Sequence, residues 1–196
     1  DGKVVVLNIL HHIFASGNDT SDRVYTTSKA IVTRYKEKIE AFLTLIGEKL
    51  EVKNFPGHAE VRIDEKGTVY PIEINPMRFG GWCTTADLVG ISLGYNLYEY
   101  YFCQKQPDWD AIYKGKEDSY FSIIILNNNS GIDAEAISKF DYEKLAKSFE
   151  NPRLIRKLNY KENPLFGFVF TETNKNNEQE LYDILSSNLR EYIVTK

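Results

Sequence analysis

Alternating polar and apolar positions predict a β-hairpin in the first half of the chain. In residues 58–63 every second residue is polar, which places the polar side chains on one face of a strand. Residues 64–67 (Asp-Glu-Lys-Gly) predict a turn, because glycine adopts a positive φ without steric cost. Residues 68–75 predict the second strand. Its apolar residues should share one face: Tyr70, Ile72 and Ile74.

A strand and a helix are expected before this hairpin. Residues 3–10 are rich in β-branched residues and favour a strand. Thr27 and Ser28 are suitable caps for a helix in which apolar residues recur every 3.6 positions up to Gly47. We expect this helix to pack on the sheet that carries the hairpin and to be structural.

The pattern changes twice after the hairpin. Residues 86–102 are helical in pattern, and their two glycines predict two short helices. Residues 106–119 have the composition of a linker, and residues 120–196 predict a small α+β unit whose last helix covers residues 179–192. The expected fold is therefore α+β: an antiparallel sheet flanked by helices in residues 1–105, followed by the linker and the C-terminal unit.

Two acidic residues of the hairpin are spaced so that they meet if its strands pair. Glu60 lies on the first strand and Glu73 on the second, and Asn75 shares the face of Glu73. Like charges that face each other across a strand pair repel, and a cation would offset that cost. Two carboxylates and an amide oxygen supply part of the oxygen shell of Mg²⁺, with positions left for water and phosphate.

Residues that bind anions follow directly. Arg78 offers a planar fork of donors, and Gly80 with Gly81 allows bare backbone N–H groups to approach an oxyanion. A surface hairpin with solvated acids and a glycine turn accounts for the same spacing. His11 and His12 are weak further candidates, because adjacent residues of a strand point to opposite faces.

These residues carry a resemblance to a known family. Glu60, Glu73-Ile74-Asn75-Pro76 and Arg78-Phe79-Gly80-Gly81 resemble the metal-binding end of an ATP-grasp domain. The resemblance covers roughly the first half of the chain, which is similar to the C-terminal part of an ATP-grasp domain in bacterial proteins of the carbamoyl phosphate synthetase and L-amino-acid ligase types. It includes the string through Trp82 and Thr85, which is similar to a subgroup of bacterial ATP-grasp proteins.

The resemblance implies a cofactor and a set of roles. Glu60, Glu73 and Asn75 would bind the metal ions of Mg·ATP, with Mn²⁺ as a substitute, and Arg78 would contact the phosphate or an acyl phosphate. Arg62 would lie near the nucleotide, at a position where several members have an apolar residue. Gly80 and Gly81 would supply backbone donors to the bound cofactor.

Composition excludes several other classes of protein. At 196 residues the chain is long enough for one domain or slightly more, and its net charge of -4 argues against general binding to nucleic acid or anionic membranes. Neither a long apolar run nor a signal-peptide pattern is present, so we expect no membrane partner. Cys83 and Cys103 fit reduced thiols of a cytoplasmic protein.

The first residues suggest a longer polypeptide. Asp1-Gly2 is a strong hairpin-turn signal, yet only the strand after it is present. We therefore expect the chain to be a fragment whose partner is an N-terminal portion of the same polypeptide, which would hold the other half of the nucleotide cleft.

Three functions are compatible with these patterns. The first is an ATP-dependent ligase that joins a carboxylate to an amine or a thiol through an acyl phosphate, its partners being small-molecule substrates. The second is a non-catalytic nucleotide- or metal-binding module of the same fold. The third is a hydrolase with Glu60 and Glu73 as an acid–base pair, although the downstream asparagine, arginine and glycines fit phosphate chemistry better. A homodimer is left open.

Overall fold

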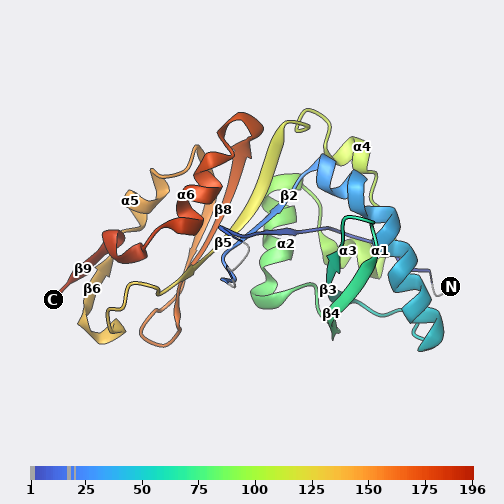
Figure 1. Ribbon diagram of the computed structural model, residues 1–196, viewed down its shortest axis with the longest axis horizontal. Helices are drawn as coiled ribbons and strands as arrows, with labels where there is room; N and C mark the ends of the chain where they lie inside the picture. The colour runs from blue at the N-terminus through green and yellow to red at the C-terminus, as the bar shows by residue number, and fades with distance from the viewer. Residues whose placement is uncertain (1–2, 17–18, 20) are drawn as a thin grey trace. The chain divides into compact units, whose positions relative to one another are not determined.

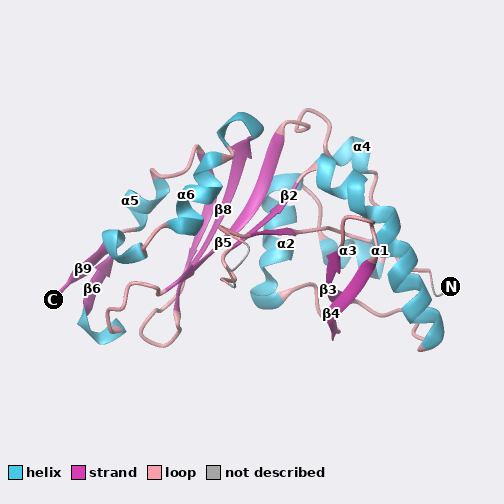
Figure 2. Ribbon diagram, viewed as in Figure 1, coloured by secondary structure: helices cyan, strands magenta, loops and turns pink. Residues whose placement is uncertain are grey.

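Antiparallel strands organise the chain in two separate compact units, a two-stranded hairpin in the first and a five-stranded sheet in the second (Figures 1 and 2). The computed structural model describes residues 3–16, 19 and 21–196. Its first unit comprises residues 3–9 and 29–117, and the second comprises the described residues of Leu10–Ser28 together with Asp118–Lys196. The α+β class expected from the sequence, with antiparallel sheets and flanking helices, is confirmed. The Asp1-Gly2 turn signal lies outside the described residues.

The first unit holds the hairpin and four α-helices (Figure 1). Its elements are α1 (Lys29–Lys49), β3 (Gly57–Ile63), β4 (Val69–Pro76), α2 (Thr84–Leu88), α3 (Leu97–Phe102) and α4 (Trp109–Ile112). A single turn of 3-10 helix (Gly81–Cys83) precedes α2, and a π-helical turn (Val89–Leu93) follows it directly.

Gly94 separates the two helical segments predicted after the hairpin. Its φ of 79° ends the π-helical turn, and the Asn96 side chain then caps α3 by accepting from the backbone N–H groups of Tyr98 and Glu99. Gly90, the other predicted break, is accommodated within the continuous helical path. The prediction of two short helices is therefore right, with one break instead of two.

Residues 3–10 form no regular secondary structure, so the predicted strand is absent there. Their backbone groups bond to side chains instead of a ladder: the Val6 N–H donates to Glu40 of α1, and the Tyr95 hydroxyl donates to the carbonyl of Leu7. β-Branched composition describes how side chains fit a pleated surface, but a strand also requires a neighbouring strand with which to pair.

The second unit is built on the antiparallel order β1-β2-β5-β8-β7. Its elements are β1 (His11–Ile13), β2 (Val24–Thr27), β5 (Ser119–Asn127), β6 (Ile137–Phe140), α5 (Tyr142–Ala146), β7 (Asn151–Lys157), β8 (Leu165–Asn174), α6 (Gln179–Ser186) and β9 (Ile193–Thr195). The β6 and β9 strands pair with each other, a contact that the sequence pattern did not predict. The predicted last helix is interrupted after Ser186, and Asn188 caps a separate 3-10 turn.

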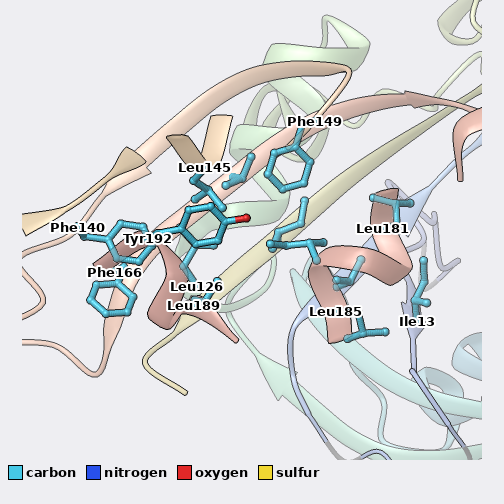
Figure 3. Packing of buried hydrophobic residues seen from close by; sticks show 14 of the residues in the cluster. Ile13, Leu126, Phe140, Leu145, Phe149, Phe166, Leu181, Leu185, Leu189 and Tyr192 are labelled. Atoms are coloured by element: carbon cyan, nitrogen blue, oxygen red, sulfur yellow. The ribbon is translucent and has the colours of Figure 1, made fainter. Parts of the chain in front are cut away.

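A core of aromatic and aliphatic residues fills this unit (Figure 3). The stacked rings of Phe140 and Phe166, with centroids 4.1 Å apart, pack with Tyr192 at one end of the cluster. Leu181 and Leu185 bring α6 onto the same cluster, which also includes Ile13 of β1. Burial of these apolar side chains is the main driving force for the assembly of the unit.

The compact units divide the chain differently from the boundaries expected at residues 105 and 120. Val24–Thr27 pairs with β5, so residues 10–28 belong to the second unit. The expected linker contains α4, whose Asp110 forms an ion pair with Lys29 at 2.9 Å, and it belongs to the first unit up to Glu117. Composition marks loops along the chain, whereas strand pairing joins segments that are distant in sequence.

Among the described residues, no helix is both long enough and apolar enough to cross a bilayer. Cys83 and Cys103 are free, exposed thiols.

Gly167 in β8 provides a test of the sheet. Its φ is 146°, and a Cβ there would overlap the carbonyl oxygen of Arg156 and lie 3.1 Å from the Cα of Lys157. We expect Gly167→Ala to lower the free energy of unfolding by about 3 kcal/mol or more, measured by urea denaturation. Gly131→Ala is the matched control, because Gly131 also has a positive φ (73°) but a Cβ there would meet no atom within 4 Å, so about 1 kcal/mol should be lost. Equal losses would show that backbone conformation alone, without the overlap, sets the cost at Gly167.

Candidate functional site

The hairpin brings four polar side chains to one face. Glu60 lies directly opposite Glu73, and His58 lies opposite Asn75. Directly opposed residues of an antiparallel pair share a face and have closely spaced Cβ atoms. The two carboxylates and the amide named from the sequence are therefore brought together, with His58 as a fourth member of the group.

A β-bulge interrupts the ladder beside the two glutamates. The register shifts after Glu60, so that Val61 pairs with Pro71 and Ile72 is left over. Proline has no N–H to give to a ladder, which explains a bulge at this point. The bulge corrects the expected face of Tyr70: it lies opposite Arg62, on the polar face of β3, and no longer shares a face with Ile74.

The two arginines occupy different places on the hairpin. The Nη2 atom of Arg78 lies 3.7 Å from the Oε1 atom of Glu73, and both side chains are about half exposed. An exposed ion pair of this length contributes little, about 0 to 1 kcal/mol. Arg62 lies on the far side of the bulge and is exposed. Arg78 therefore rests against a proposed metal ligand, while Arg62 lies further along the strand.

The segment that follows β4 is strained. Met77, Trp82 and Cys83 have φ values of 60°, 55° and 58°, in the left-handed region that side chains disfavour. Such residues cost about 1 to 3 kcal/mol each and persist only when their surroundings hold them. Strain of this kind is concentrated at functional sites, and here it begins one residue after Pro76.

Gly80 and Gly81 differ in how freely they could accept a side chain. Gly80 has a φ of 93°, and a Cβ there would lie 2.7 Å from the hydroxyl oxygen of Thr85 and 3.9 Å from Cδ2 of His58. A Cβ at Gly81 would meet no atom within 4 Å. The requirement for glycine is therefore strict at Gly80, where the chain passes close to His58, and open space lies beside Gly81.

His58 is the functional candidate that the sequence pattern did not single out. It is half-buried, and burial lowers the pKa of its imidazole; Arg78 lowers it further, while the Glu60 and Glu73 carboxylates oppose the shift. The Nδ1 atom of His58 is buried and has no hydrogen-bond partner among the described residues. Its place two residues before Glu60, on the same strand face, was the signal that could have found it.

The donor set fits a hard divalent cation in part. Glu60 and Glu73 supply carboxylate oxygens, and the side-chain oxygen of Asn75 is the third donor. Within the described part of the chain, no group of three or more His, Cys, Asp and Glu side chains is placed to hold a metal. The hairpin would therefore leave most of the coordination shell to water and phosphate oxygens, an arrangement that Mg²⁺ commonly adopts.

The adjacent histidines belong to the other unit. His11 and His12 lie in β1, where His12 Nε2 bonds to the carbonyl oxygen of Ser21 at 2.9 Å and its ring stacks on Tyr25. His12 thus has a structural role within the second unit.

The fold is of the α+β class, and its β3–β4 hairpin gathers polar side chains that could bind a metal ion or a phosphate. A family model described as "ATP-grasp domain" matches residues 1–86, which include Glu60, Glu73, Asn75 and Arg78. Residues 1–86 thus match an ATP-grasp domain, in line with the resemblance noted in this part of the sequence.

One solved structure shows that the likeness in fold extends beyond the matched segment. The crystal structure of L-amino acid ligase from Bacillus licheniformis is similar over 100% of this chain and 51% of its own, with 21% identity and a TM-score of 0.65. At this identity the likeness shows a shared fold, and the chain spans about half the length of that ligase. Phosphoribosylglycinamide synthetase from Anaerococcus prevotii shows 14% identity over 96% of this chain and 48% of its own; its TM-score of 0.46 is too low to support a structural argument. A search of curated proteins found no match.

The contact between Arg78 and Glu73 leads to a prediction about metal affinity without nucleotide. A divalent cation must compete with Arg78 for the Glu73 carboxylate, so Arg78→Gln should strengthen Mn²⁺ binding by up to about fivefold. Lys66→Gln, in the hairpin turn, removes the same charge from the same hairpin without touching Glu73 and is the control. Mn²⁺ titration followed by water-proton relaxation measures both. A gain of equal size in the two variants would mean that only net charge matters.

Proposed function

We propose that the chain is part of an ATP-dependent ligase that joins a carboxylate to an amine or a thiol through an acyl-phosphate intermediate. One observation carries the proposal: Glu60 and Glu73 face each other across β3 and β4, with Asn75 on the same face and Arg78 against Glu73. These residues lie inside the segment that matches the ATP-grasp family.

Each residue has a role in the proposed reaction. Glu60, Glu73 and Asn75 hold Mg²⁺ through their side-chain oxygens, and the bound metal would neutralise charge on the transferring phosphoryl group. Arg78 has two parallel donors with which to hold the oxygens of that group. Arg62 lies near the nucleotide, and the backbone N–H groups of Gly80 and Gly81 bind phosphate oxygens.

The substrates follow from this chemistry. The carboxylate oxygen attacks the terminal phosphorus of ATP, ADP leaves, and the amine nitrogen or thiolate then attacks the acyl carbon and expels inorganic phosphate. The relative named as an L-amino acid ligase supports amino acids as the substrate class.

The two thiols, free in the structure, support a reducing and hence cytoplasmic location.

Removal of one carboxylate tests the site directly. Glu73→Gln keeps the size and hydrogen-bonding capacity of the side chain but removes its charge. We expect it to weaken binding of Mg·ATP at least tenfold in calorimetric titration, because a charged ligand of the metal is lost. Glu65→Gln, in the turn of the same hairpin, is the charge-matched control and should bind as the unaltered chain does. Equal affinities of all three proteins would show that the hairpin acids are not the ligands.

A second measurement distinguishes a ligase that turns over ATP from a module that only binds it. A ligase should release phosphate from ATP only when both the carboxylate and the amine are added, and Glu73→Gln should abolish that release. Binding of Mg·ATP by the intact protein with no amine-dependent release across a panel of amino acids would favour a module that binds nucleotide without turnover.

A further inference from the structure

Two buried polar atoms beside the proposed metal ligands have no partner. Nδ1 of His58 and Nδ2 of Asn75 are closed to solvent, and neither has a hydrogen-bond partner within the described residues. Their residues are cross-strand neighbours in the ladder, next to the pair formed by Glu60 and Glu73. Unpaired buried polar groups are rare in folded proteins, and two at adjacent ladder positions call for a specific explanation.

The chemistry of the two atoms identifies the kind of partner that they lack. The nitrogen of an asparagine amide is only a donor, so it cannot coordinate a cation. A neutral histidine carries a hydrogen on one ring nitrogen, and Nδ1 donates in one of the two tautomers. Arg78, whose Nη2 lies 3.7 Å from Oε1 of the neighbouring Glu73, adds a cationic donor at this end of the hairpin. Two side-chain N–H donors and a guanidinium suit an oxyanion.

We propose that His58 is a further binding residue of this site: its Nδ1 and the Nδ2 of Asn75 donate to oxygens of the phosphate chain bound at the β3–β4 hairpin. The inference rests on the proposed function and deepens it. Asn75 then binds with both ends of its amide, the oxygen toward the metal and the nitrogen toward phosphate.

The strained segment after β4 explains how a ligand reaches atoms that are closed to solvent. This segment, residues 77–83, passes close to the His58 ring at Gly80 and contains three side-chain-bearing residues with left-handed backbone. The ligand-free form thus carries both backbone strain and two unpaired donors. A shift of residues 77–83 that admits phosphate supplies the missing partners and offsets the cost of the rearrangement.

Nuclear magnetic resonance of the histidine rings tests whether Nδ1 of His58 binds phosphate. Inorganic pyrophosphate with Mg²⁺ is the probe, because this method detects binding even when the affinity is weak. We expect the Nδ1 resonance of His58 to shift with saturation as pyrophosphate is added, while the rings of His11 and His12 in the other unit serve as internal references. Their resonances should stay in place.

Two substitutions identify the nitrogen involved. His58→Asn places an amide nitrogen near the position of Nδ1, whereas His58→Gln places one near Nε2. We expect His58→Gln to weaken pyrophosphate binding about tenfold or more and His58→Asn to retain affinity within about threefold. Amide spectra of both variants check that the hairpin is still folded.

The outcomes separate this inference from the proposed function. If the backbone amides of Glu60 and Glu73 shift but the His58 ring does not, phosphate binds at the hairpin without His58, and the inference fails while the proposed function stands. Equal weakening in the two variants would also overturn the role of Nδ1. If no hairpin resonance responds to pyrophosphate, both the phosphate site and the role of His58 are wrong.

Discussion

Repulsion between two opposed carboxylates is the constraint on which the candidate site depends. Glu60 and Glu73 face each other across β3 and β4, where like charges destabilise a strand pair. The exposed ion pair between Arg78 and Glu73 offsets only part of that cost, because water screens it. The proposed divalent cation between the carboxylates would offset more of that repulsion than the ion pair does.

The same hairpin end concentrates other features that cost free energy. Pro71 forces a bulge next to Glu73, the backbone is left-handed at Met77, Trp82 and Cys83, and buried donors of His58 and Asn75 are unpaired. Each feature would be removed by selection for stability alone. Their occurrence together in residues 58–83 of the first unit supports the proposed binding site.

The second unit is dominated by contacts that stabilise the fold. Its sheet pairs five antiparallel strands over a core in which Phe140, Phe166 and Tyr192 pack closely. Even its buried acid is satisfied: Glu180 accepts from the backbone N–H of Glu150 and from the hydroxyl of Thr173. A buried carboxylate with such partners stabilises the fold where an unpaired one would destabilise it.

The sequence by itself determined the hairpin, the pairing of its two acids and the family resemblance, because alternation with period two and a glycine turn are local signals. Tertiary structure alone decided that residues 10–28 join the second unit and that residues 3–10 do not form a strand, because strand pairing depends on partners distant in the chain. It alone showed that Nδ1 of His58 is buried and has no hydrogen-bond partner within the described residues. Whether a polar side chain is buried and unpaired depends on what packs around it, and no local pattern encodes that.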